Sequence, residues 1–169
     1  MNRENDIGPY NHVRGGLYNC IVEIPRDSKV KTEYSGYTDS YEVDRISPFP
    51  YPVNYGFVPG TLGKDGDPLD VLVVEGEPLP IGSITGCQPA GVLQVVDNGE
   101  VDDKVLMVPH WVPGVATLES FGRLWKIDVM DFFKKYKKGV EVIGWRDRTL
   151  AERTIETAIQ DWHSKNSEI

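Results

Sequence analysis

The sequence has few cysteines and histidines, no excess of basic residues and no long hydrophobic run. Its two cysteines, Cys20 and Cys87, have a spacing that suits no zinc site, so we expect buried free thiols in a reducing compartment. No apolar run approaches the roughly 18 residues that a membrane-spanning helix needs. The formal net charge of −8 disfavours binding to nucleic acid or to an anionic membrane.

The composition is that of an ordinary globular protein. Hydrophobic residues make up 40% and charged residues 26% of the 169 positions, and no repeat or linker marks a boundary, which predicts a single domain over residues 1–169. Residues 1–7 lack the apolar core of a signal peptide, so the sequence predicts a cytoplasmic location.

Short β-type runs separated by turns dominate the first part of the chain, a pattern typical of a barrel or sandwich. The predicted strands are residues 17–25, 31–35, 41–46, 71–74, 83–87, 91–96, 104–108 and 140–145. Residues 47–60 hold four prolines and four aromatic residues, which predicts an ordered irregular crossing.

Two segments have helical periodicity. Apolar residues recur at helical spacing over residues 117–138, where Gly139 offers a stop, and again over residues 149–164. The pattern therefore predicts a small β-barrel that carries two helices.

The hexapeptide from Asp65 to Asp70, with the sequence DGDPLD, places three carboxylates directly before a β-type run. Pro68 forbids a regular helix there, so we expect a loop that leads into a strand and aims Asp65, Asp67 and Asp70 at one point. Oxygen ligands of this kind suit Mg²⁺. A solvated acidic turn is an equally common explanation, whereas Pro68 disfavours an EF-hand.

A second acidic loop, with Asp97, Asp102 and Asp103, also lies between β-type runs, although alone it is more often a hairpin turn. Basic residues accompany the two loops: Lys31 and Arg45 lie inside predicted strands, Lys104 follows Asp102, and Tyr136 and Lys137 end the first helix. If these groups share a cavity, metal ions on carboxylates and facing cations would suit a phosphate ester or anhydride.

The sequence resembles the family I soluble inorganic pyrophosphatases of the short, prokaryotic type. The likeness rests on the hexapeptide, on Asn54–Phe57 before it, and on segments in the family's order along nearly the whole chain. These segments begin at Glu23, Lys31, Val43, Tyr51, Pro89, Asp97, Val108, Phe132 and Tyr136. The resemblance implies a mainly β fold, a five-stranded OB-like closed barrel with two flanking helices, and hydrolysis of pyrophosphate to two orthophosphates.

The resemblance also implies a role for each candidate residue. Metal ligands would be Asp65, Asp70, Asp97 and Asp102, with Glu23 and Glu33 serving the outer metal shell. The substrate phosphates would be held by Lys31, Arg45, Tyr55, Lys104, Tyr136 and Lys137. Asp67 would accept or orient the proton of a metal-activated water that attacks in line, with Tyr55, Lys31 and Arg45 also catalytic. The resemblance implies several Mg²⁺ ions per site, with Mn²⁺ or other divalent ions as alternatives, and a homohexamer.

Thr32 departs from the family pattern, which usually has tyrosine between the lysine and the glutamate. Two other functions are compatible with parts of the pattern. A metal-dependent phosphatase of small organic esters would use the same groups. An OB-type module for single-stranded nucleic acid is opposed by the acidic charge.

Overall fold

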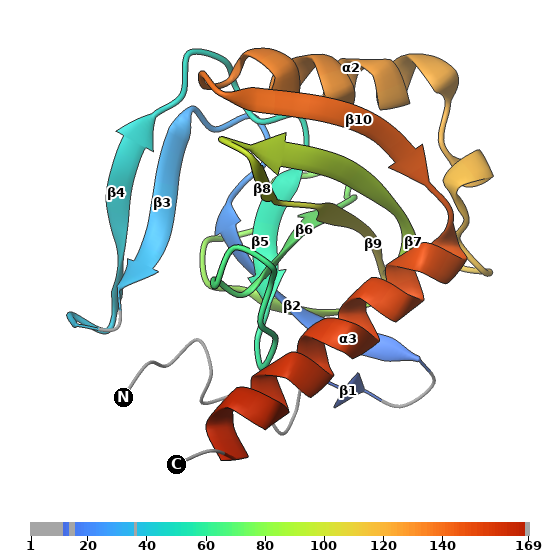
Figure 1. Cartoon of the computed structure of the whole chain (residues 1–169). Coiled ribbons are helices and arrows are strands. Elements are labelled where there is room, and N and C mark those ends of the chain that lie inside the picture. Colours follow the sequence, from blue (N-terminus) through green and yellow to red (C-terminus); the bar gives the residue numbers. More distant parts are fainter. Residues whose placement is uncertain (1–11, 14–15, 36, 168–169) are drawn as a thin grey trace.

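The computed structural model describes residues 12–13, 16–35 and 37–167 (Figure 1). The strands are β1 (His12–Val13), β2 (Leu17–Ile24), β3 (Val30–Ser35), β4 (Ser40–Ile46), β5 (Asn54–Val58), β6 (Leu69–Val73), β7 (Ile84–Asp97), β8 (Glu100–Val101), β9 (Lys104–Pro109) and β10 (Val140–Arg146). The helices are the 3-10 turn η2 (Leu118–Ser120), α2 (Arg123–Lys135) and α3 (Arg148–Ser167). Residues 1–7, which bear on the predicted location, lie outside the described residues.

Five strands close into a barrel. The hydrogen-bonded order runs β2, β5, β6, β9, β7, and β7 returns to pair with β2, which leaves no open edge within this ring. The pair β6–β9 is parallel and the other pairs are antiparallel, so the barrel is mixed. β1, β8 and β10 extend it. The predicted mainly β, five-stranded closed barrel with two flanking helices is confirmed.

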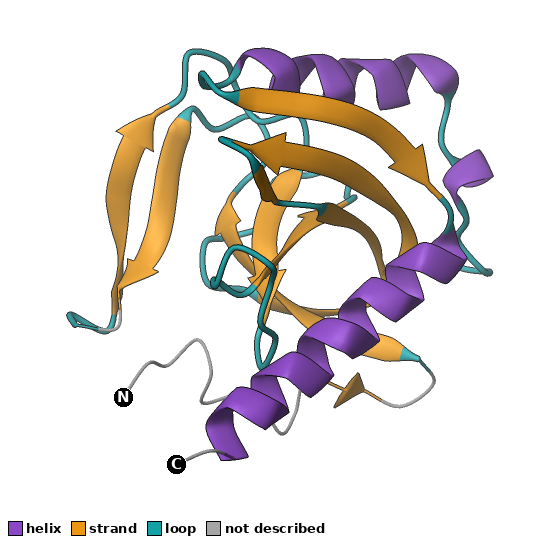
Figure 2. Cartoon of the chain, in the orientation of Figure 1, coloured by secondary structure: helices purple, strands orange, loops and turns teal. Residues whose placement is uncertain are grey.

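The two helices cover different parts of the barrel (Figure 2). α2 buries Val129, Phe132 and Phe133 in a cluster that includes Tyr51 and Tyr55. α3 packs a second apolar face against residues of β6, β7 and β9, and this face consists of Ala151, Ile155, Ala158 and Ile159. Each helix thus closes one apolar cluster of the barrel. None of the helices described in these residue ranges is long and apolar enough to cross a membrane.

The β3–β4 hairpin is a two-stranded sheet of its own and stands beside the barrel (Figure 1). Its strands pair from Val30–Ile46 to Ser35–Ser40, with a bulge after Lys31. Gly36, between the two strands, lies outside the described residues. The hairpin carries Lys31 and Arg45 to one side of the barrel.

Three details differ from the expectations. The crossing predicted over residues 47–60 contains β5, because the alternating apolar residues after Pro52 complete the sheet between β2 and β6. The two strands predicted at residues 83–96 form one strand, β7, whose register shifts between Pro89 and Gly91. The first helix begins at Arg123, after η2, rather than at Thr117. Cys20 and Cys87 are buried free thiols, as predicted.

Candidate active site

The acidic hexapeptide is a tight loop that ends in β6. Gly66 adopts a φ of 89°, a region that favours glycine. The Asp67 backbone N–H donates to Asp65 Oδ1 over 3.0 Å, and the Gly63 N–H donates to the Asp67 carbonyl over 2.7 Å. At the start of β6, Thr61 Oγ1 accepts a hydrogen bond of 2.9 Å from the Leu69 backbone N–H. These bonds fix the carboxylates relative to the barrel.

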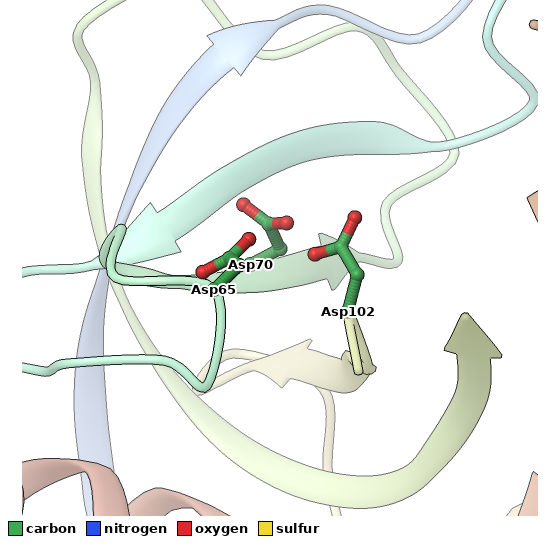
Figure 3. Close-up of side chains that lie close together, drawn as sticks. All are labelled: Asp65, Asp70 and Asp102. Atoms are coloured by element: carbon green, nitrogen blue, oxygen red, sulfur yellow. The ribbon is translucent and has the colours of Figure 1, made fainter. Parts of the chain in front are cut away.

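Three carboxylates converge at the start of β6 (Figure 3). One oxygen each of Asp65, Asp70 and Asp102 lies within 4.8 Å of the others. Asp65 comes from the loop, Asp70 from β6, and Asp102 from the turn between β8 and β9, so the parallel neighbours β6 and β9 bring the two acidic loops together. An all-oxygen donor set on rigid backbone fits a hard divalent cation such as Mg²⁺.

Lys104, the first residue of β9, is the counter-charge of this cluster. Its side chain is 1% exposed, and its ammonium lies 2.7 Å from Asp70 Oδ2 and 2.8 Å from Asp102 Oδ2. It also donates to Tyr55 Oη over 3.0 Å. An ammonium has three hydrogen-bond donors, so these three acceptors satisfy the buried charge.

The pKa values reflect crowding of like charge. Burial, followed by the charges of Asp65 and Asp70, raises the pKa of Asp67. Burial and the charge of Asp70 raise the pKa of Asp102 to about 7, although Lys104 opposes this shift. For Asp70, burial acts in the same direction, but Lys104 prevails and holds the pKa of Asp70 below its ordinary value. Additional positive charge would therefore be favourable here.

Basic and aromatic side chains adjoin the carboxylates. The Arg45 guanidinium lies over the Tyr136 ring, 4.9 Å from its centroid. Arg45 Nη2 is buried and has no hydrogen-bond partner among the described residues. Lys137 pairs with Asp97, and Lys31 pairs with Asp44 over 3.0 Å. Acidic neighbours thus pair with two of the cationic side chains, Lys31 and Lys137.

A cleft of about 170 Å³ joins the two sides. The predicted site residues that line it are Glu23, Lys31, Glu33, Tyr55, Asp65, Asp67, Asp70, Asp97, Asp102, Lys104, Tyr136 and Lys137. Arg45 is absent from the lining, and its guanidinium contacts the ring of Tyr136, which does line the cleft. Glu23, Glu33 and Asp97 line the cleft outside the three-carboxylate cluster. Their predicted ligand roles remain predictions.

Two residues of the site, Tyr51 and Asp44, were not predicted from the sequence. Tyr51 lines the cleft and contacts Tyr55, Phe132 and Tyr136. The aromatic Pro-rich segment around Tyr51 was the available signal. Asp44 is the partner of Lys31, a contact that depends on the bulge in the hairpin and has no local sequence signal.

A larger cavity, about 320 Å³, lies on the other side of the acidic loop, against α3. Leu62, Leu69 and Leu150 contribute to its lining. It shares Asp65, Asp70 and Asp102 with the smaller cleft but includes none of the predicted phosphate-binding residues, so the smaller cleft is the candidate active site.

The fold and the cleft agree with the comparisons to known proteins. The inorganic pyrophosphatase family model matches residues 20–163. The chain belongs to the family I inorganic pyrophosphatases. Within this family, the inorganic pyrophosphatase of Xylella fastidiosa (strain 9a5c) is 41% identical, over 84% of this chain and 87% of that protein. The predicted family, in its short prokaryotic type, is confirmed.

Solved inorganic pyrophosphatases have the same fold. The Neisseria gonorrhoeae structure has a TM-score of 0.84 at 35% identity and covers 90% of this chain and 94% of that one. The Thermus thermophilus structure has a TM-score of 0.85 at 30% identity, with coverages of 90% and 94%. The chain thus matches family members over nearly their full length.

Proposed function

We propose that this protein is a metal-dependent hydrolase that converts inorganic pyrophosphate to two orthophosphates. The observation that carries the proposal is the cleft itself, in which a three-carboxylate cluster shares the lining with Lys31 and Lys137 within a pyrophosphatase fold. A phosphoanhydride needs cations on its oxygens and a strong nucleophile at phosphorus, and the two sides of the cleft are suited to these needs.

Asp65, Asp70 and Asp102 would hold a divalent cation, with Mg²⁺ the first choice and Mn²⁺ an alternative. The bound cation supplies Lewis acidity, which lowers the pKa of a water molecule and neutralises phosphate charge. Asp97, Glu23 and Glu33 are proposed to serve further metal ions around the substrate. These three carboxylates lie at the walls of the same cleft.

Asp67 is proposed to take the proton of the attacking water. It lines the cleft, and the pKa of its carboxyl is raised by burial and by Asp65 and Asp70, which makes it a better proton acceptor than an ordinary aspartate. Attack would be direct and in line, so no side chain is phosphorylated.

The substrate phosphates are proposed to lie against the basic side. Lys31, Lys104 and Lys137 act as point charges, Arg45 offers its unpaired Nη2, and Tyr55 and Tyr136 present hydroxyls. These groups would stabilise the leaving phosphate as charge builds on it. A cleft of about 170 Å³ favours pyrophosphate over an ester with a bulky organic leaving group.

We propose a single domain, since both helices pack on one barrel. We also propose a cytoplasmic location and a homohexamer.

The test measures phosphate release from pyrophosphate and, in parallel, from an organic phosphomonoester. We expect Mg²⁺-dependent release from pyrophosphate that excess chelator abolishes. Asp67→Asn should lower kcat by about 100-fold or more, in the range of general-base loss. Asp128→Asn, on the exposed face of α2, is the matched control and should leave kcat unchanged. Folded, Mg²⁺-loaded protein that released no phosphate from pyrophosphate would refute the proposal.

A further inference from the structure

The position of the β3–β4 hairpin relative to the barrel depends on contacts other than a strand ladder. β3 and β4 pair with each other in a two-stranded sheet, separate from the sheet that forms the barrel (Figure 1). Yet Lys31 and Arg45, two of the proposed phosphate-binding cations, are on this hairpin. The geometry of the basic side therefore depends on how the hairpin is docked.

Glu23, in β2, receives two hydrogen bonds from β3. Thr32 Oγ1 donates to the Glu23 backbone carbonyl, and the Tyr34 backbone N–H donates to Glu23 Oε2 over 3.2 Å. Thr32 is the one buried residue among the six of β3, with 8% of its surface exposed. The hydroxyl thus makes a buried bond between the hairpin and a barrel strand.

Thr32 also adjoins the irregular point of the hairpin. Lys31 pairs with Arg45 and Thr32 pairs with Val43, so Asp44 is an extra residue between them. A bulge of this kind redirects the side chains beside it. Because Thr32 follows Lys31 directly, its bond to Glu23 fixes the backbone from which Lys31 extends into the cleft.

We propose that Thr32 is a positioning residue for substrate binding: its hydroxyl, bonded to Glu23, docks the hairpin so that Lys31 reaches the phosphates. The inference rests on the proposed function and goes beyond it, since Thr32 itself transfers no proton and holds no phosphate. The main effect should be on substrate affinity, because the water-activating carboxylates come from the barrel and its loops.

Thr32→Val tests the proposal, because valine keeps the shape of threonine and removes the hydroxyl. Loss of one buried hydrogen bond corresponds to a threefold to tenfold effect. We expect KM for Mg²⁺-pyrophosphate to rise by that factor, with kcat changed by less than about twofold. Calorimetry with imidodiphosphate, a slowly hydrolysed analogue, should show the same factor in Kd. Thr32→Ser keeps the hydroxyl and should restore both values.

Hydrogen exchange gives a readout that does not depend on activity. In Thr32→Val, backbone amides of residues 30–35 and 40–46 should exchange faster, while those of β7 should not change. Thr154→Val is the matched control. It removes a threonine hydroxyl that donates to the Leu150 carbonyl over 2.7 Å within α3, away from the hairpin.

Unchanged KM and Kd in Thr32→Val, or equal changes in Thr154→Val, would overturn the proposal. If Thr32→Val failed to fold, Thr32→Ala would carry the same comparison. Wild-type protein without pyrophosphate hydrolysis would instead refute the proposed function, and the positioning role with it.

Discussion

Lys104 shows how one residue can reconcile a buried acidic cluster with a folded core. A lone buried ammonium would be unfavourable, but Asp70, Asp102 and Tyr55 accept all three of its donors. The two carboxylates raise the pKa of Lys104, so it stays charged. The basic residue beside the second acidic loop is therefore a structural partner of the carboxylates as well as a proposed phosphate ligand.

Lys104→Met should lower the free energy of unfolding by about 3 kcal/mol in excess chelator, because it leaves Asp70 and Asp102 without their counter-charge. Urea denaturation at pH 7 measures the change in the free energy of unfolding. Added Mg²⁺ should make the loss in Lys104→Met smaller. Lys64→Met is the control, since the Lys64–Asp161 pair spans 3.8 Å with side chains 66% and 46% exposed, and should change stability by less than about 1 kcal/mol. Equal losses in the two variants would contradict this interpretation of Lys104.

At the scale of elements, the barrel depends on a close approach of β5 to β2. A Cβ added at Gly56 would lie 1.8 Å from the Ile21 carbonyl oxygen, so the strands could not keep their spacing. Gly56→Ala should therefore lower the free energy of unfolding by about 2 kcal/mol, as expected for overpacking. Gly76→Ala, which meets nothing within 4 Å, should have little effect. Thermal or urea unfolding compares the two, and an unaffected Gly56→Ala would refute the close-approach argument.

The elements also show what the sequence could and could not predict. Periodicity located most strands and both helices, because residues such as Ile155 and Phe133 must face the core. β5 was hidden because prolines lie on both sides of it, which favoured an irregular crossing over a strand. The acidic loops were evident as local motifs. Their meeting required the parallel β6–β9 pair, and the Lys31–Asp44 contact required the bulge; neither is encoded locally.

The whole molecule carries apolar surface that an oligomer could cover. Ile84, at the start of β7, is 55% exposed and Trp111 is 50% exposed. The His110 N–H donates to the Gly86 carbonyl, which places these two parts of the chain next to each other. Such exposed side chains are common at subunit interfaces.

We expect sedimentation velocity to give a particle of six times the 19.0 kDa mass of the chain. Ile84→Asp should shift this particle to smaller species, because a charge would be buried at the contact. Leu124→Asp adds the same charge at an exposed position of α2 and serves as the control. A wild-type particle with the mass of one chain would contradict the predicted hexamer.

The return of β7 to β2 has a consequence for the order of folding. Closing the ring joins segments far apart in the chain, and such contacts form late because their loop entropy must be overcome first. Asp102 reaches Asp70 only when β9 has taken its place beside β6. During refolding, recovery of enzymatic turnover should therefore follow the long-range pairing of β9 with β6 rather than the earlier formation of helices. The contact that makes the chain active is thus one of those that form late.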